Sequence, residues 1–505
     1  MKFNFLIRKQ TAVINHEGAK AYALTPETEL YAAVVTASLS DNFYETAPDR
    51  LARITDLIAK NKAEYVAKLA IYARTQMNMR SVPLALAVEL SKINSGNGIV
   101  SKAVTGVVKR ADEIPELLAY YQVSNKREGV KKLNRLSKQV QKGLAVAFNT
   151  FDEYQFAKYN RDTAVRLRDA LFLVHPKAKD NAQQALFDKI AANTLATPYT
   201  WETELSAAGK VAYAGKAQKE AAITAKWEEL IDSDKMGYMA TLRNLRNIIQ
   251  AGVSAAHITK VCRYLANKKA VANSKQLPFR FLAAYRELRA MDSEYATMAL
   301  TALEDAIAAS AENIQGFDEH TAVLIACDVS GSMQKPVSSM SRILLYDVGL
   351  VLGMLLQRKC TRVVTGMFGD RWKIINMPSK NVLANVEEYY RREGEVGYAT
   401  NGYLVINDLI ARGVRMDKVM MFTDCQLWNN KQGFNSLQKS WANYRSIYPE
   451  AQLYLFDLAG YGTVPIDVKA GGVHLIAGWS DKIFEALHAI ENGGNAISKI
   501  NNIQL

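Results

Sequence analysis

The pattern of apolar residues changes once along this chain, near Gly316, and that change most constrains how the chain can fold. From about Pro26 to Ile314, apolar residues recur at helical spacing, as at positions 51, 54, 57 and 58. Short segments with Gly, Asn or Pro separate these helical patterns. Helices at intervals of about 20 residues favour a solenoid of stacked helix pairs, and the alternative is an irregular helical domain.

After Gly316, short apolar runs alternate with helical patterns. The expected strands are 321–327, 361–368, 418–423, 451–458 and 473–477, and the expected helices are 340–358, 402–412, 434–447 and 481–491. Strands rich in Val, Leu, Ile and Phe that alternate with helices predict a parallel sheet covered on both faces. We therefore expect two domains: an all-α helical-repeat domain at 1–316 and an α/β, Rossmann-like domain at 317–505.

The charge of the chain is unevenly distributed. The formal net charge is +13, and the first 320 residues carry +10 of it, with 44 Lys and Arg against 34 Asp and Glu. A basic surplus on one part of a chain favours a polyanionic partner, such as a nucleic acid or an anionic membrane surface. The helical part is therefore the expected site of contact with such a partner.

The sequence predicts a cytoplasmic protein without a membrane span. The longest apolar run, 343–356, contains Asp347 and is shorter than the ~20 residues that a spanning helix needs. The apolar stretch at the N-terminus is too short for the core of a signal peptide. The four cysteines lie far apart and form no C-x-x-C motif, which favours reduced thiols over a disulfide framework or a zinc site.

A run of oxygen-bearing side chains follows the first expected strand. Asp328, Ser330 and Ser332 lie where this strand gives way to a loop, at the edge where parallel sheets bind their ligands. Carboxylate and hydroxyl oxygens suit a hard divalent cation, such as Mg²⁺ or Mn²⁺. The alternative is that Asp328 and Ser330 only cap the following helix.

Two further oxygen donors are expected at the same edge of the sheet. Asp424 follows the expected strand 418–423, and Thr400 lies just before the expected helix 402–412. Because the carboxyl ends of parallel strands meet at one edge, we expect both side chains to lie near Asp328. The sequence thus predicts a metal site made from three separate segments.

Residues 126–142 contain seven basic residues and one acidic residue. On one continuous helix, about 100° per residue would place four basic side chains within roughly 60° of one another; these are Lys131, Arg135, Lys138 and Lys142. The row would be about 16 Å long, the scale of a few phosphate spacings. It predicts a face that binds RNA, whereas the alternative is an ordinary solvated helix face.

Four segments resemble one known family. Residues 166–177, which read RLRDALFLVHPK, are similar to the signature of the TROVE module, the helical-repeat part of the Ro autoantigen family. Residues 79–87, 239–247 and 277–279 resemble further segments of that module. The Asp-x-Ser-x-Ser pattern with Thr400 and Asp424 resembles the metal-ion-dependent adhesion site (MIDAS) of von Willebrand factor A-type domains. Together these resemblances cover essentially the whole chain.

The resemblance implies a HEAT-like helical-repeat ring, monomeric and closed by the A-type domain. Such ribonucleoproteins bind small noncoding Y RNAs on the outer rim and pass the 3′ ends of misfolded or defective noncoding RNAs through the hole, in RNA quality control. By position, the resemblance assigns Arg168, His175 and Lys177 to the outer RNA surface. Phe172 stands where many relatives carry a further basic residue.

The resemblance also assigns roles within the metal site. It implies that Ser330, Ser332 and Thr400 coordinate magnesium directly or through water, and that Asp328 and Asp424 act mostly through bound waters. An open position would accept a carboxylate from a partner, such as an exoribonuclease or another protein.

The chain shows no catalytic motif. It contains no H-E-x-x-H, no nucleophile elbow and no phosphate-binding loop. We therefore expect a non-catalytic RNA-binding protein. Two alternatives remain: a metal-dependent scaffold for protein interactions that is not directed to RNA, and an unrecognised nuclease.

Overall fold

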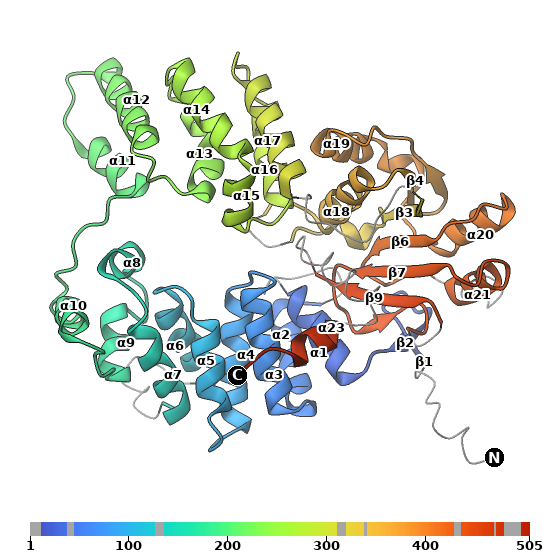
Figure 1. Ribbon diagram of the computed structural model, residues 1–505, viewed down its shortest axis with the longest axis horizontal. Coiled ribbons are helices and arrows are strands. Elements are labelled where there is room, and N and C mark those ends of the chain that lie inside the picture. Colours follow the sequence, from blue (N-terminus) through green and yellow to red (C-terminus); the bar gives the residue numbers. More distant parts are fainter. Residues whose placement is uncertain are drawn as a thin grey trace. The chain divides into compact units, whose positions relative to one another are not determined.

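The computed structural model describes residues 12–37, 45–126, 136–310, 320–337, 341–428, 436–468, 471–478 and 496–505. They form helices and a larger, mostly parallel sheet (Figure 1). The chain divides into two compact units, Met1–Leu51 with Gly237–Ala496 and Ala52–Met236 with Ile497–Leu505. The predicted division at residue 316 marks the change from helices to strands. It coincides with no limit of either unit, and as a domain boundary it stays a prediction.

The unit of residues 52–236 is built from helices. They are α2 (Ala47–Lys60, which begins in the other unit), α3 (Ala63–Thr75), α4 (Ser81–Ile93), α5 (Ile99–Val107), α6 (Glu113–Ser124), α7 (Lys138–Phe148), α8 (Glu153–Tyr159), α9 (Leu167–Val174), α10 (Asn181–Ala192), α11 (Trp201–Lys210), α12 (Lys216–Asp232) and α23 (Ala496–Asn501). Helix α3 packs against α5 and α5 against α7, while α4 packs against α6. Contact between every second helix is typical of stacked helix pairs, so the predicted helical repeat is confirmed here.

Close packing of α5 and α7 depends on Gly143. A Cβ atom at this position would lie 2.6 Å from Cβ of Val104 and 2.7 Å from the carbonyl oxygen of Ser101. On the same side of α7, Val140 and Leu144 are fully buried. This apolar side fixes which face of α7 is left for solvent.

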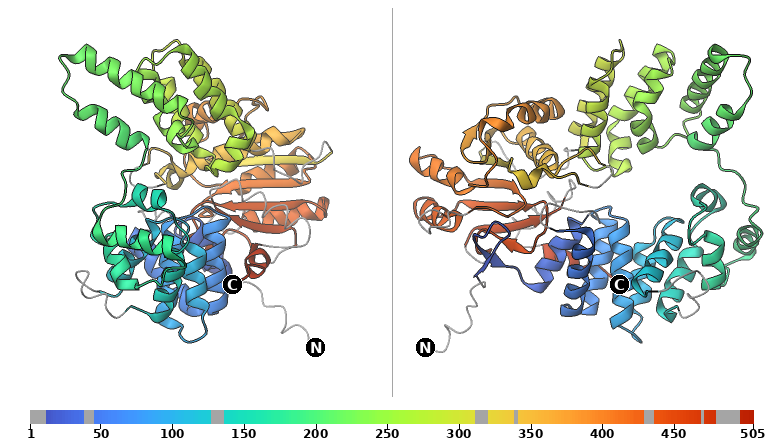
Figure 2. Two further views of the ribbon diagram at one scale, coloured as in Figure 1. Left: turned by 60° about the vertical axis from the view of Figure 1, so that its left-hand side comes forward. Right: turned by 180° about the vertical axis from the view of Figure 1, so that it is seen from behind.

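The larger sheet, seen from two further sides in Figure 2, has the strand order β5-β4-β3-β6-β7-β9. Its strands are β3 (Ala322–Asp328), β4 (Arg362–Phe368), β5 (Trp372–Ile374), β6 (Lys418–Thr423), β7 (Gln452–Asp457) and β9 (Val473–Ala477). All neighbouring strands are parallel except β5, which is antiparallel to β4. The five expected strands and the parallel sheet are confirmed, and β5 is an addition that the sequence did not predict.

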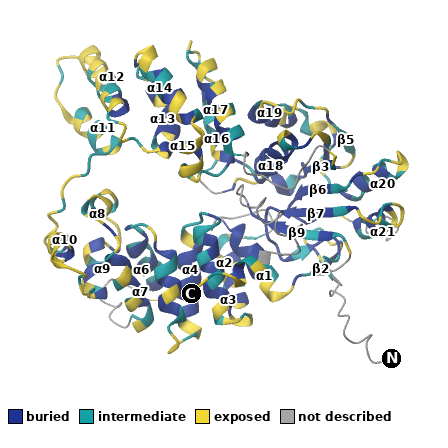
Figure 3. Ribbon diagram, viewed as in Figure 1, coloured by how far each residue is buried: buried dark blue, intermediate teal, exposed yellow. Residues whose placement is uncertain are grey.

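Helices cover both faces of this sheet. They are α18 (Leu345–Lys359), α19 (Val382–Arg392), α20 (Tyr403–Ala411) and α21 (Leu437–Ile447). Gly353 of α18 lies against Ile325 and Cys327, and Gly402 at the start of α20 lies against Met421. Gly349 of α18 faces Phe422, the neighbour of Met421. Because adjacent strand residues point to opposite faces, α18 and α20 lie on opposite faces. The central strands β3, β6 and β7 are accordingly buried (dark blue in Figure 3).

The order of the strands reverses between β3 and β6. From β3 the chain adds β4 and β5 on one side, and it then returns to add β6, β7 and β9 on the other. In doubly wound sheets, ligands bind beyond the carboxyl ends of the strands at such a switch point. The expected helix 481–491 lies outside the described residues.

A small second sheet joins the N-terminal segment to the same unit. It consists of β1 (Ala12–Ile14), β2 (Lys20–Ala23) and β8 (Thr463–Val464), all antiparallel. The helix α1 (Pro26–Val35) follows β2, and Tyr31 of α1 donates its hydroxyl to the carbonyl oxygen of Ala477 in β9, at 3.2 Å. The N-terminal residues therefore pack with the strands, although the sequence placed them in the helical domain.

Residues 237–310 add five helices to this unit. They are α13 (Tyr238–Gln250), α14 (Ala255–Ala266), α15 (Lys268–Ser274), α16 (Phe279–Arg289) and α17 (Ala296–Ser310). The four cysteines are free thiols and are buried. Among the described residues, no helix has both the length and the apolar character that a bilayer span needs.

A partly buried arginine connects α16 to α18 and α19. Arg286 donates two hydrogen bonds to the carboxylate of Asp347, at 2.7 and 2.8 Å, and a third to Glu387 at 2.6 Å. The side chain of Asp347 is inaccessible to solvent. Its carboxylate also accepts a hydrogen bond from the backbone N–H of Leu344, which precedes α18. This network holds the helices of 237–310 against the α/β part of the same unit.

Replacing Arg286 with alanine should lower the free energy of unfolding by about 2–4 kcal/mol, because it leaves the carboxylate of Asp347 buried without its partner. Urea unfolding followed by circular dichroism measures the change. The matched control is Arg391→Ala, which removes an exposed ion pair with Glu388 on α19 and should change the free energy by about 0.5 kcal/mol or less. Equal effects of the two substitutions would contradict a stabilising role for Arg286.

Candidate functional site

Asp328, the last residue of β3, is the centre of the predicted metal site. Its side chain is buried. One carboxylate oxygen accepts a hydrogen bond from the backbone N–H of Ser330 at 2.9 Å, and the other accepts one from the hydroxyl of Thr423 at 2.6 Å. These two bonds fix the carboxylate at the carboxyl edge of the sheet, between β3 and β6.

The two serines of the predicted site lie together beside Asp328. Their hydroxyl oxygens are 3.2 Å apart, and both residues are buried. Ser332 belongs to a short 3₁₀ helix, η2 (Gly331–Gln334), and Ser330 immediately precedes it without making a side-chain cap bond. Helix capping therefore does not account for the hydroxyl of Ser330, and the alternative interpretation of this segment is wrong on that point.

Asp424 follows β6 and is completely buried. Its oxygen Oδ1 accepts a hydrogen bond from the backbone N–H of Gln426 at 3.0 Å. The next residue, Cys425, has a φ of 62°, so the chain turns sharply directly after the carboxylate. The strand end and this turn place Asp424 at the same edge as Asp328, as the sequence predicted.

Thr400 reaches this edge on a loop that its neighbours hold in place. The carbonyl oxygen of Thr400 accepts a hydrogen bond from the N–H of Trp428 at 3.0 Å, and the N–H of Asn401 donates to Gly369 at 3.1 Å. The N–H of Gly331 donates to the carbonyl oxygen of Tyr398 at 3.2 Å, which ties this loop to η2. The structure thus brings the segments that carry all five predicted residues to one edge of the sheet, and their role as metal ligands stays a prediction.

Two oxygen atoms of this group test whether a cation fits. Oγ1 of Thr400 and Oδ2 of Asp424 are buried, and neither has a hydrogen-bond partner among the described residues. A buried polar atom without a partner destabilises a fold by about 1–3 kcal/mol. Both atoms belong to the predicted ligand set, and oxygen ligands of this kind suit Mg²⁺ or Mn²⁺. The donor set therefore fits a divalent cation.

The electrostatics of the two carboxylates favour a cation as well. Burial raises the pKa of Asp328 and of Asp424, and the charge of Asp328 raises the pKa of Asp424 further. Hydrogen bonds from Ser330 and Thr423 to Asp328 oppose the first shift. The nearby hydroxyl of Ser332 and the N–H of Gln426 oppose the second. A divalent cation would compensate two adjacent negative charges that the protein itself leaves partly uncompensated.

The turn between β1 and β2 lies beside this site. The amide nitrogen of Asn15 donates to the carbonyl oxygen of Leu427 at 2.9 Å, and the N–H of His16 donates to Oε1 of Gln426 at 3.0 Å. The following residue, Glu17, is close enough for its charge to raise the pKa of Asp328. The N-terminal hairpin therefore supports the loop that carries Asp424.

The sequence interpretation missed Thr423 and Gln426, which hold the two carboxylates. Thr423 stands in the strand run that was used to place Asp424, but no role was assigned to it. The pairing register of the two strands would have indicated Thr423. Strands β3 and β6 pair Cys327 with Phe422, so Thr423 is the residue opposite Asp328. Among the described residues, no three His, Cys, Asp or Glu side chains form a metal cluster, so a site here depends on hydroxyls.

The predicted basic row on one helix needs a correction. Lys131 and Arg135 lie outside the described residues. Helix α7 begins only at Lys138, because Ser137 is extended, with φ −54° and ψ 129°, and its N–H donates to the hydroxyl of Tyr121. A single helix that carries all four basic residues is therefore wrong, and the RNA-binding role of the four stays a prediction.

The remaining RNA candidates lie on neighbouring elements. We call the exposed residues Lys138, Lys142, Arg168, His175 and Lys177 the basic surface. Helix α7 contacts the end of α9, since Gln141 donates to the carbonyl oxygen of Val174 at 3.0 Å, and Asn149 donates to that of Lys177 at 3.0 Å.

Two details distinguish the basic surface at α9. The guanidinium of Arg168 lies over the ring of Phe172, 5.7 Å from its centroid. His175 ends α9 in the left-handed conformation, with a φ of 47°. The chain therefore turns at His175 and carries Lys177 back toward α7. No described contact tests whether any of these side chains binds RNA.

Comparison with known proteins gives a consistent result. The TROVE domain model matches residues 29–197 and 194–327. The crystal structure of the Deinococcus radiodurans Ro (RSR) protein superposes with a TM-score of 0.58 at 18% sequence identity, over 92% of this chain and 99% of that one. Two curated relatives, telomerase protein component 1 of mouse and the same protein of rat, are each 24% identical to this chain over 48% of its length.

The share of each relative's length that this chain covers differs between the relatives. The chain spans only 12% of the length of the two telomerase components. At 18% identity, the Deinococcus structure supports the fold alone, namely helical repeats with a sheet towards the C-terminus. The match to the family model extends from α1 into β3 and covers more than half of the chain. On this match, the chain belongs to the TROVE family, whose members include the Ro proteins.

Proposed function

We propose that this protein is a non-catalytic RNA-binding protein of the cytoplasm that binds small, Y-like noncoding RNAs. Its second class of ligand would be the 3′ ends of misfolded or defective noncoding RNAs, which it would bind in RNA quality control. The observation that carries the proposal is the TROVE match over residues 29–327, because TROVE and Ro proteins bind RNA. The closed ring that the resemblance implies stays a prediction.

The basic surface supports this proposal. Its members are exposed, and the lysines and Arg168 pair with no carboxylate among the described residues. Double-stranded RNA is recognised mainly through its phosphates and its shape, which requires exposed cations on a rigid support. Helices α7 and α9 provide such a support, because their apolar sides are buried in the helical stack.

Neutralising four members of the basic surface should flatten the salt dependence of RNA binding. In a variant with Lys138, Lys142, Arg168 and Lys177 all replaced by Gln, each lost phosphate contact should reduce the slope of log affinity against log salt concentration by about 0.7–0.9. Filter binding of a hairpin RNA at several salt concentrations measures the slope.

The matched control removes four exposed lysines from the α11–α12 region of the same unit, Lys210, Lys216, Lys219 and Lys235. Both variants lower the net charge by four, so a difference between them reports location and not total charge. If the two variants flatten the slope equally, the basic surface is not the RNA site. RNA that is degraded in Mg²⁺ by the parent, but not by Asp328→Ala, would instead support a nuclease.

We propose further that the oxygens around Asp328 bind Mg²⁺ or Mn²⁺ as a MIDAS within a von Willebrand A-type domain. The two buried oxygens without partners, Oγ1 of Thr400 and Oδ2 of Asp424, support this proposal. The cation would supply a positive charge to which a partner protein can add a carboxylate. This is also the basis of the second candidate function, a metal-dependent protein-interaction scaffold.

Replacing Thr400 with valine should weaken Mn²⁺ binding by about tenfold or more, because it removes a ligand oxygen while keeping the shape of the side chain. It should not lower the free energy of unfolding of the metal-free protein, because the lost hydroxyl has no partner there. Titration calorimetry and urea unfolding in EDTA measure the two effects.

Thr365→Val is the matched control. The hydroxyl of Thr365 in β4 donates to the carbonyl oxygen of Ile375 at 2.7 Å, so its removal should destabilise the fold by about 1 kcal/mol without changing Mn²⁺ affinity. Unchanged Mn²⁺ binding in Thr400→Val would remove Thr400 from the metal site.

A further inference from the structure

The helices α13 to α16 come from a stretch that contains no acidic residue until its end. Between Asp234 and Glu287 the sequence has ten Lys and Arg and no Asp or Glu. In a chain with 63 basic and 50 acidic residues, a run of 52 residues without a carboxylate is a strong local bias. It gives these helices a positive potential that their own sequence does not neutralise.

Two arginines of this stretch are close enough for their charges to interact. Burial, and then the like charge of Arg243 on α13, lower the pKa of Arg280 on α16. Neither guanidinium forms a hydrogen bond or an ion pair within the part of the chain that is described. Both side chains are exposed, on the packed helices α13 and α16. They add unpaired positive charge to this group of helices, which favours a polyanionic ligand.

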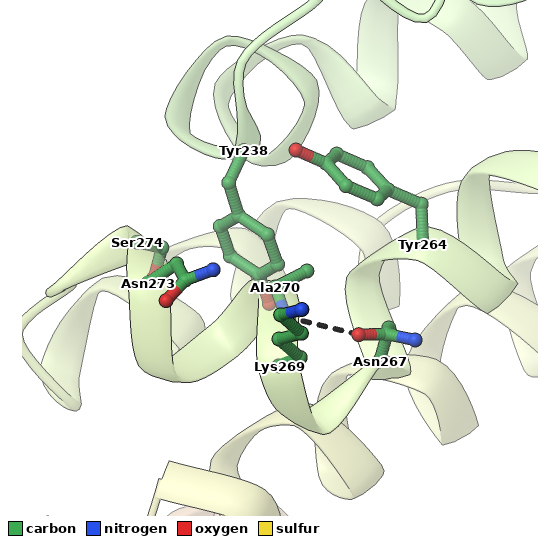
Figure 4. A pocket seen from close by; sticks show the side chains of 7 residues that line it. All are labelled: Tyr238, Tyr264, Asn267, Lys269, Ala270, Asn273 and Ser274. Carbon is green, nitrogen blue, oxygen red and sulfur yellow. Dashed lines mark hydrogen bonds between the residues drawn. The ribbon is translucent and has the colours of Figure 1, made fainter.

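A pocket of about 410 Å³ opens among α13, α14 and α15. Tyr238 and Tyr264 form its aromatic side, with their ring centroids 5.6 Å apart (Figure 4). Tyr238 is buried and is fixed by a hydrogen bond from its hydroxyl to the carbonyl oxygen of Leu265, at 2.7 Å. Tyr264 is 38% exposed and presents its ring to solvent. The pocket thus has one rigid ring that supports one accessible ring.

The other residues of the pocket are polar or basic. Asn273 and Lys269 of α15 are exposed, and neither is paired within the described part of the chain. Asn267 accepts a hydrogen bond from the N–H of Ala270 at 2.9 Å through its side-chain oxygen, so its amide N–H₂ group remains a donor. The pocket offers an aromatic face, two amides and a cation, but no carboxylate.

A second pocket of the protein shows how specific this combination is. It has a similar volume, about 460 Å³, and also contains a tyrosine, Tyr213. Its lining includes two carboxylates, Glu204 and Glu229, together with Lys226, which forms ion pairs with both. That lysine is held by carboxylates, whereas Lys269 is unpaired within the described part of the chain. The two pockets therefore differ in the cation that they offer to a phosphate, and not in size or aromatic content.

We propose that the pocket of α13, α14 and α15 binds an unpaired nucleobase of single-stranded RNA, stacked on Tyr264. Base stacking on an exposed aromatic ring is the usual source of affinity for single strands. The amides of Asn267 and Asn273 bind the polar edge of the base, and Lys269 binds an adjoining phosphate. The inference rests on the proposed RNA-binding function, but it concerns a site distinct from the basic surface.

The test compares a single-stranded RNA of about ten nucleotides, with one 2-aminopurine, and a blunt RNA hairpin. Tyr264→Ala should weaken binding of the single strand by roughly 5- to 150-fold, the range measured for loss of one stacked base, and should leave the hairpin affinity within about twofold. Tyr264→Phe keeps the ring and should retain single-strand affinity. The 2-aminopurine fluorescence should be quenched by the parent and by Tyr264→Phe, but not by Tyr264→Ala.

Two further variants protect the test from effects on folding. Asn273→Asp changes an exposed side chain, adds a carboxylate to the pocket and should weaken single-strand binding alone. Tyr213→Ala in the acidic pocket should have no effect on either RNA. Unchanged single-strand binding by Tyr264→Ala and Asn273→Asp, or an equal loss for both RNAs, overturns the inference while RNA binding stands. A parent protein that binds neither RNA overturns both proposals.

Discussion

The carboxyl edge of the sheet must hold two carboxylates, Asp328 and Asp424, in a buried environment. Parallel pairing of β3 and β6 brings them there, and both pKa values rise because burial disfavours their charged forms. The surrounding structure is arranged around this constraint: Thr423 donates to Asp328, the N–H of Gln426 donates to Asp424, and the Thr400 loop is tied to both strand ends. What these donors leave unsatisfied is what a cation would satisfy.

The positions of the candidate metal ligands could be predicted from the sequence because each segment that carries them is recognised locally. An apolar run that ends in a carboxylate marks a strand end, and parallel strands bring their ends to one edge, so Asp328 and Asp424 needed no long-range information. Thr400 was placed by a different local signal, its position just before the expected helix 402–412. The donors that fix the carboxylates are harder to recognise, because Thr423 acts only through the register of two strands.

The features that sequence analysis missed depend on tertiary contacts or on absences. Helix α7 begins after Ser137, whose N–H contacts Tyr121. The helical spacing of apolar residues carries no information about this tertiary contact, so the prediction of one continuous basic helix was wrong. The pairing of β2 with β8 joins segments from opposite ends of the chain. The stretch without acidic residues in α13 to α16 is not a dense cluster of basic residues. A search for basic clusters therefore does not find it, because its positive charge comes from the absence of Asp and Glu.

The pairing of β2 with β8 also has a consequence for biosynthesis. Tyr22 pairs with Val464, so the amino-terminal hairpin must wait for about 440 further residues before its partner strand exists. At 5–20 residues per second, translation takes roughly 20–90 s to reach that point. Helices α3 to α12 can pack on the ribosome during this interval, whereas the hairpin stays without its partner. The segment that later supports Asp424 therefore gains its partner strand only after most of the chain has been made.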